Sequence, residues 1–244
     1  MFQGVYDSFC KTWHGTFEII FVTPSRLGSL KLQDRGEIQW IQDFGCPSRA
    51  LQIGWLAAKA DWVSFATDDC TFDLNTMDSA WRTLGKYEFD PSTVIVCKYT
   101  ESDHWSKWMM TPWYYHAWFH GDFRHPNIPF WFKLYMNGLI SKKLLLEVGG
   151  FDCKYETMAY CYNDLSMRLQ FYGCRFVIEK DRLDHCTWQP KESSDHGPVH
   201  HAVMEHDAPL FRGVYWAKKF KSVIKIPVDN WQQVASKWPR RFKQ

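Results

Sequence analysis

The chain has 244 residues, 45% hydrophobic and 23% charged, so it is long enough and apolar enough to bury a full core. Its net charge of +2 argues against a nucleic-acid-binding surface, and no stretch reaches the roughly 18 apolar residues of a membrane span. The eight cysteines contain no CxxC pair, and no secretory signal follows Met1. We therefore expect reduced thiols and a cytoplasmic location.

Hydrophobic spacing predicts that helices and strands alternate along the first hundred residues. The expected elements are, in chain order, a helix at 2–13, strands at 17–22 and 38–41, a helix at 47–60, a strand at 62–66, a helix at 74–84 and a strand at 93–97. Pro47 supports the start of the second helix, because proline suits the first helical position.

Regularity breaks at 104–132, a stretch rich in aromatic residues, histidine and proline, and then returns. The later elements are expected at 135–140, a helix at 141–148, a Gly149-Gly150 turn, a helix around 162–172 and a strand at 175–179. Alternating strands and helices are typical of a mostly parallel sheet covered on both faces. The sequence therefore predicts an α/β fold.

Two adjacent carboxylates, Asp68 and Asp69, follow the apolar residues of the strand at 62–66. In open α/β sheets, ligands bind outside the carboxyl ends of the strands. Neighbouring like charges repel unless a cation lies between them, and Mg²⁺ is usually held by one or two carboxylates plus substrate phosphates. The alternative is that Asp68 caps a following helix and Asp69 is solvated.

The segment 136–173 resembles the acceptor half of nucleotide-sugar glycosyltransferases with the GT-A fold, especially those of the family 2 type. The resemblance rests on GGFD at 149–152, then Asn163-Asp164, Arg168 and Gly173 in that order.

The upstream half is similar to the same family. It has the strand FEIIFV, a helix that contains Arg49, and a strand that ends in a DxD-like element. The resemblance covers roughly residues 5–187. It implies a GT-A three-layer sandwich with a mostly parallel central sheet.

On the acceptor side, the resemblance implies that Asp164 is the general base of an inverting transfer to a glycan or other hydroxyl acceptor. A base must deprotonate that hydroxyl as the anomeric carbon of the donor is attacked. A carboxylate at a helix start would be held by backbone N–H groups. The alternative is that Asp164 is only the N-cap of a helix from Leu165 to Tyr172.

On the donor side, the resemblance implies a nucleotide-diphosphate sugar and Mn²⁺ or Mg²⁺. Asp69 and His185 would contact the metal, and Asp68, Thr67 and Arg49 would lie on the nucleotide side. A bound metal would stabilise the charge of the diphosphate leaving group. His185 could instead be a surface histidine hydrogen-bonded in a loop.

Several positions depart from the family pattern. Thr67 occupies the first place of the DxD motif, Asn163 replaces a glutamate, and Thr23 or Pro24 replaces the nucleotide-contacting aspartate. The opening strand of the family has no counterpart before Met1.

We expect a GT-A-like domain at 1–190, with a donor half at 1–100 and an acceptor half at 101–190. Residues 191–244 are expected to be a C-terminal extension that packs on the domain or trails it. The aromatic stretch 104–132 falls where sugar rings could stack, or it packs as a satellite core.

Two other functions remain open from the sequence. A non-catalytic glycan-binding module would keep the fold and use its aromatic side chains. A metal-dependent hydrolase would use the histidines at 195–207, although Gly197-Pro198 interrupts any helix that would place His196 and His200 on one face.

Overall fold

The computed structural model describes residues 2–24, 32, 35–68, 70–101, 122–123, 132–186, 201–215 and 224–238. Of 98–101, 122–123 and 180–186 it describes the backbone. Within this part of the chain, no helix is long and apolar enough to cross a membrane.

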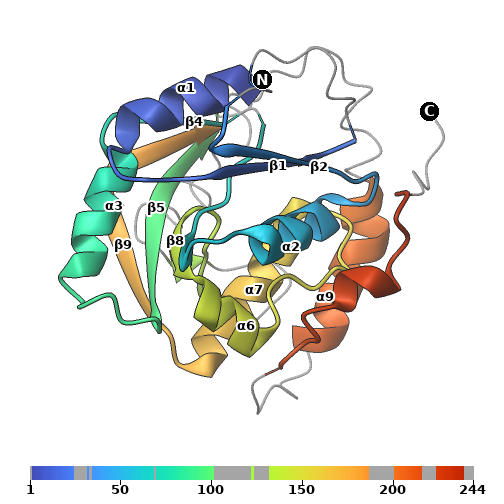
Figure 1. Ribbon diagram of the computed structural model, residues 1–244. Coiled ribbons are helices and arrows are strands. Elements are labelled where there is room, and N and C mark those ends of the chain that lie inside the picture. The colour runs from blue at the N-terminus through green and yellow to red at the C-terminus, as the bar shows by residue number, and fades with distance from the viewer. Residues whose placement is uncertain are drawn as a thin grey trace.

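The described part of the chain contains helices, helical turns and strands in mixed order (Figure 1). The α-helices are α1 (Phe2–Thr12), α2 (Pro47–Ala57), α3 (Thr76–Gly85), α6 (Lys142–Val148), α7 (Met158–Tyr172) and α9 (Ala208–Tyr215). A π-helical turn at Val203–Asp207 leads into α9, and a 3₁₀ turn lies at Asn230–Gln233. The strands are β1 (Ile19–Thr23), β2 (Ile38–Gln42), β3 (Trp62–Val63), β4 (Cys70–Phe72), β5 (Thr93–Glu101), β6 (Asp122–Phe123), β7 (Phe132–Lys133), β8 (Gly138–Ser141) and β9 (Arg175–Cys186).

The central sheet has the strand order β3-β8-β5-β9-β4 and is mixed. β5 and β9 pair in parallel, whereas β3–β8, β8–β5 and β4–β9 are antiparallel. The α/β fold is confirmed, but the expectation of a mostly parallel central sheet is not met here. Parallel neighbouring strands need a crossover connection, which is usually a helix. The sequence analysis inferred parallel strands from the alternating helices that it predicted, and it overlooked short strands such as β4, which no helix separates from β3.

Both faces of the sheet are covered, which gives three layers. Successive side chains of β5 alternate between two cores: Val94 and Val96 pack with α2, α6, α7 and α9, whereas Ile95 and Cys97 pack with α1 and α3. Figure 1 shows α1 and α3 on one side of these strands and the other helices grouped opposite. This double burial explains why TVIVC is apolar throughout.

β1 and β2 form a separate parallel pair, with Ile19 opposite Ile38 and Thr23 opposite Gln42. α2 packs against β1. Phe21 of β1 packs with Tyr6 of α1 in a small core of its own. The carboxyl ends of these two strands therefore meet at Thr23 and Asp43, whose N–H donates to the Thr23 carbonyl at 3.2 Å.

Helix α7 begins at Met158, with Thr157 at the N-cap, and not near Tyr162 as the sequence analysis expected. Every residue from Tyr160 to Leu169 is buried, so this central part of the helix has no solvated face. A helical stretch buried all round shows no amphipathic period, and this is why the start of the helix was missed.

The Gly149-Gly150 turn joins α6 to the GGFD segment through two left-handed residues. Gly149 caps α6 at φ 88° and Gly150 follows at φ 69°. A Cβ at Gly150 would lie 2.4 Å from Gln52 Oε1 and 2.6 Å from the Trp55 ring. Glycine at this position thus satisfies both the backbone angle and the close approach of α2.

We predict that Gly150→Ala destabilises the protein by about 2–4 kcal/mol, from the positive φ and the overlap with α2. The midpoint of urea unfolding should fall accordingly. Gly213→Ala is the matched control, since Gly213 is an exposed helical residue with open space around its Cα. That control should be neutral or stabilising by up to about 1 kcal/mol; equal midpoints for the two variants would contradict the described packing.

Candidate functional site

The DxD-like segment lies in a turn between β3 and β4. Asp68 is exposed, and the carbonyl of Thr67 accepts a hydrogen bond from the Cys70 N–H at 3.1 Å. Asp69 lies outside the described residues. The sequence analysis correctly expected Asp68 to emerge where the apolar residues end.

Strand pairing brings His185 to the same place. In the antiparallel β4–β9 pair, His185 lies opposite Thr71, two positions after Asp69. The backbone register therefore places His185 beside β4, which lies more than a hundred residues earlier in the chain. Within the described residues, no three His, Cys, Asp or Glu side chains are grouped as a metal site.

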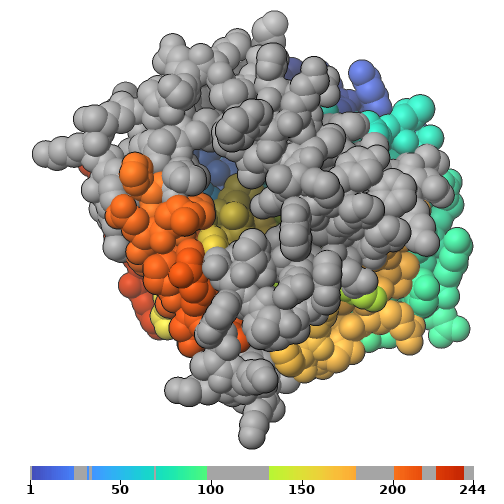
Figure 2. Space-filling model, turned by 180° about the vertical axis from the view of Figure 1, so that it is seen from behind, coloured from blue at the N-terminus to red at the C-terminus, as the bar shows by residue number. Residues whose placement is uncertain are grey.

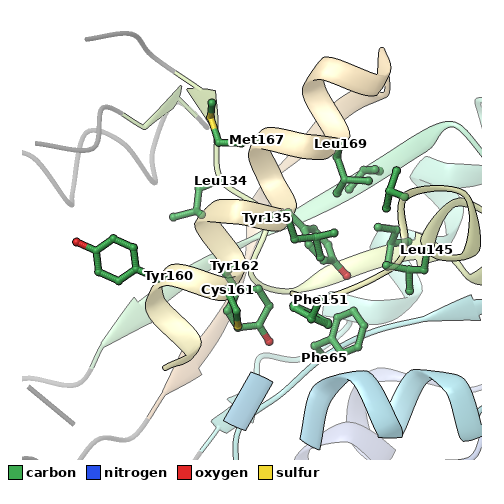
Figure 3. Packing of buried hydrophobic residues seen from close by; sticks show 14 of the residues in the cluster. Phe65, Leu134, Tyr135, Leu145, Phe151, Tyr160, Cys161, Tyr162, Met167 and Leu169 are labelled. Carbon is green, nitrogen blue, oxygen red and sulfur yellow. The ribbon is translucent and has the colours of Figure 1, made fainter. Parts of the chain in front are cut away.

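Aromatic packing connects this turn to the GGFD segment. Phe65, just before the turn, meets Phe151 edge-to-face with ring centroids 4.9 Å apart, and Phe151 meets Tyr162 of α7 at 5.4 Å. Figure 3 shows these three rings gathered under α7. The donor-side turn and the acceptor-side helix thus rest on one continuous core.

Asp164 lies inside α7, buried at 3% exposure, and not at a helix start as expected. Arg168 Nε donates to its Oδ2 at 2.8 Å, Nη2 forms an ion pair with the same oxygen at 2.8 Å, and the Tyr215 hydroxyl donates to its Oδ1 at 2.6 Å. Burial and the Asp164 charge hold the pKa of Tyr215 well above its usual range, so this phenol stays a donor. Both carboxylate oxygens of Asp164 therefore accept hydrogen bonds from side chains.

Arg168 is fully buried and also fixes the glycine turn. Its Nη1 donates to the Val148 carbonyl at 2.9 Å and its Nη2 to the Gly150 carbonyl at 2.6 Å. One guanidinium therefore sets the position of both α7 and the loop that carries Asp152.

Asp152 is a carboxyl group of the GGFD segment beside this pair. Burial, followed by the nearby charge of Asp164, raises its pKa. The Lys154 N–H donates to its Oδ1 at 3.0 Å and partly opposes that shift.

Arg49 lies at the carboxyl edge of β1 and β2, where it pairs with Asp43. Its Nε donates to Asp43 Oδ1 at 3.0 Å, its Nη1 donates to the Trp231 carbonyl, and its guanidinium lies over the Trp231 ring at 4.9 Å. Arg49 is 6% exposed, so these contacts provide the partners of a buried positive charge. The sequence analysis missed Asp43, although a carboxylate directly after an apolar strand was the signal it used for Asp68.

The C-terminal segments pack onto the same region. Gln52 Nε2 donates to the Gly149 and Val228 carbonyls, and its Oε1 accepts the N–H of Phe151 at 2.7 Å. Asn230 Oδ1 accepts the Cys153 N–H at 2.8 Å. Residues 224–238 therefore hold the GGFD loop against α2.

A second contact from the C-terminal part lies at the start of α7. The carboxylate of Asp207, fully buried, accepts the N–H groups of Glu156 and Thr157 at 2.9 and 2.8 Å and the Nδ1 of His206 at 2.8 Å. The sequence analysis noted the histidines here but not Asp207. Of its zinc candidates, His196 and His200 lie outside the described residues, as does most of the aromatic stretch 104–132.

The molecule is hollowed on the face seen in Figure 2. Blue atoms of the first part of the chain and yellow atoms from around residue 155 lie at the bottom, and the orange atoms of 201–215 border one side. Atoms from the first part of the chain, from around residue 155 and from 201–215 thus share this face.

No family model and no curated protein sequence matches the chain. Among solved structures it is similar to residues 1–349 of S. aureus TarS, with a TM-score of 0.57 and 13% identity over 84% of this chain and 62% of that one. The same part of TarS in complex with UDP gives a TM-score of 0.55, again with 13% identity. GalNAc-T7 with UDP, GalNAc and Mn²⁺ gives 0.49 at 12% identity over 71% of this chain and 38% of that one, too low to carry an argument.

The chain therefore spans less than two thirds of the TarS segment that it matches. At this identity the likeness concerns the fold alone, and that fold is α/β and GT-A-like. The expected resemblance is thus confirmed at the level of fold.

We predict that Asp164→Asn lowers the free energy of unfolding by about 3–5 kcal/mol, because it leaves the buried Arg168 charge without its partner. Chemical denaturation measures this loss. Glu147→Gln is the matched control: its ion pair with Lys225 is solvent-exposed, so the change should cost less than about 1 kcal/mol. Wild-type stability of Asp164→Asn would contradict the buried pairing.

Asp152 should make stability depend on pH in a definite direction. A raised pKa means that the folded protein holds this proton more tightly than the unfolded chain, so ionisation costs stability. Asp152→Asn should therefore gain on the wild type as the pH rises from about 4, the ordinary carboxyl value, through the raised one. Urea unfolding across that range measures the difference, and a constant difference would contradict the prediction.

Proposed function

We propose that the chain is a glycosyltransferase that moves a sugar from a nucleoside-diphosphate donor to a hydroxyl group. The observation that carries the proposal is the β4–β9 register, which pairs His185 with Thr71, three positions after Asp68, in a GT-A-like fold. Supporting it, the TarS segment of similar fold has been seen in complex with UDP.

The donor diphosphate would bind at the turn between β3 and β4. A hard divalent ion, Mn²⁺ or Mg²⁺, needs only one or two protein carboxylates when phosphate oxygens of the substrate complete its shell. We assign Asp69 and His185 to the metal, and Asp68 with Thr67 to the nucleotide side. The ion would supply positive charge to the leaving diphosphate.

The nucleoside would lie toward the carboxyl edge of β1 and β2. The Asp43 carboxylate lies at that edge, held by Arg49 and by the Gly45 N–H at 2.9 Å. Arg49 was predicted to contact the nucleotide itself, and this stays a prediction. Its described contacts favour an indirect part, in which it fixes Asp43 and the segment that contains Trp231.

On the acceptor side, the role that remains to be assigned is that of the general base. Asp164 as base stays a prediction, and its described surroundings favour a positioning role, since a base must come within hydrogen-bond reach of the acceptor hydroxyl. We propose that the pair of Asp164 and Arg168 holds the GGFD loop in place, and that transfer inverts the anomeric carbon.

Isothermal calorimetry with UDP tests the donor site. We expect Mn²⁺ to tighten binding at least about tenfold, because it links the diphosphate to a carboxylate, and Asp69→Asn to remove that gain. Asp61→Asn is the matched control, an exposed aspartate at the other end of the same chain segment. It should keep the Mn²⁺ effect.

Failure of the wild type to bind UDP or any UDP-sugar in Mn²⁺ would refute the proposal. Binding of a UDP-sugar with no release of UDP would instead favour a non-catalytic binding module.

A further inference from the structure

We propose that His206 accepts the proton of the acceptor hydroxyl and that Asp207 orients its ring. This inference rests on the proposed glycosyl transfer and names a residue that the sequence analysis did not assign. The buried carboxylate of Asp207 has no role in the glycosyl transfer proposed above.

Asp207 is fully buried, and every one of its described contacts is a donor. Its Oδ1 accepts the Glu156 N–H and the His206 Nδ1, and its Oδ2 accepts the Thr157 N–H at 2.8 Å and the Thr157 hydroxyl at 2.5 Å. An ionised carboxylate only accepts hydrogen bonds, and four donors are the partners that it needs when buried.

This arrangement fixes the role of each imidazole nitrogen. Because Asp207 accepts, His206 Nδ1 must carry the proton in that 2.8 Å bond. In the neutral ring, Nε2 then has its lone pair available. The same division of roles lets a buried aspartate prepare histidine as a proton acceptor in hydrolases.

The Nε2 atom is also well placed. The His206 side chain is 25% exposed, and its Nε2 lies 3.9 Å from Oε1 of Glu156, which directly precedes the start of α7 and follows the GGFD loop. The helical segment that contains it borders the hollow in Figure 2. His206 further lies on the π-helical turn Val203–Asp207, a distortion that is frequent at functional sites.

Asp164 and His206 differ in exposure and in how many of their polar atoms accept or donate hydrogen bonds within the protein. Asp164 is 3% exposed, and both its oxygens accept bonds from side chains. His206 is held through Nδ1 by Asp207, its Nε2 faces Glu156 at 3.9 Å, and its side chain is 25% exposed. Access of the acceptor hydroxyl favours His206 over Asp164, because a base must contact the proton that it removes.

The step balances without any further reagent. The acceptor O–H bond breaks and its proton moves to His206 Nε2, giving an imidazolium that Asp207 and Glu156 both face. The acceptor oxygen forms a bond to the anomeric carbon, and the bond to the diphosphate oxygen breaks. The electron pair leaves with the nucleoside diphosphate.

His206→Asn distinguishes the roles of the two ring nitrogens. The amide NH₂ can replace Nδ1 as the donor to Asp207, while nothing replaces Nε2. We measure UDP release from UDP-glucose, UDP-galactose and UDP-N-acetylglucosamine with Mn²⁺, using water or added sugars as acceptor. Release should fall about 100-fold or more, with UDP affinity and thermal stability close to wild type. His201→Asn, on a half-exposed histidine of the same segment, should keep wild-type release.

Histidine NMR provides a readout that needs no turnover. In long-range ¹H–¹⁵N spectra, the signal missing from His206→Asn should report a neutral ring that is protonated on Nδ1. A neutral ring protonated on Nε2 would overturn the inference, since its Nε2 could not accept a proton. So would wild-type UDP release by His206→Asn. Failure of the wild type to bind UDP counts instead against the proposed function.

Discussion

The buried guanidinium of Arg168 is the interaction on which the arrangement of α6, the GGFD loop and α7 depends. It lies on α7 and donates to the Asp164 carboxylate and to the carbonyls of Val148 and Gly150. A charge without solvent must have each of its donors satisfied, and here the partners come from a helix, a helix end and a loop. The position of the GGFD loop is therefore specified by electrostatics as much as by packing.

The donor and acceptor sides share a polar network that is built largely around amide groups. Gln52 connects α2 with the glycine turn and with residues 224–228, and Asn230 connects the same turn region with the end of the chain. Such networks are stable only when every member is paired, and they then define one arrangement of the parts. Because this arrangement brings α2 closest to the chain at position 150, that residue is a glycine.

Sequence patterns predicted the layers because their causes are local. Val94 to Cys97 are apolar at every position since both faces of β5 are buried, and Pro47 starts α2 as expected. The antiparallel partners of β5 and β9 were not predictable in the same way, because pairing is decided between distant segments. The partners of Asp164 lie 4 and 51 positions away and Asp207 accepts from Glu156 51 positions away, and the burial of Tyr160 to Leu169 erased the period that would have located the start of α7.

The order in which these contacts can form has a consequence for synthesis. The GGFD loop receives Asn230 from 77 residues downstream, and Arg49 meets Trp231 across 182 residues. Closing such long loops costs entropy that local helices and strands do not pay. On the ribosome, the sheet and α7 can therefore form early, while the loop stays without its final partners until residues 224–238 have emerged. The nascent chain would then be most exposed to misfolding and to chaperones in that interval, and the GGFD loop would be fixed only after the sheet has formed.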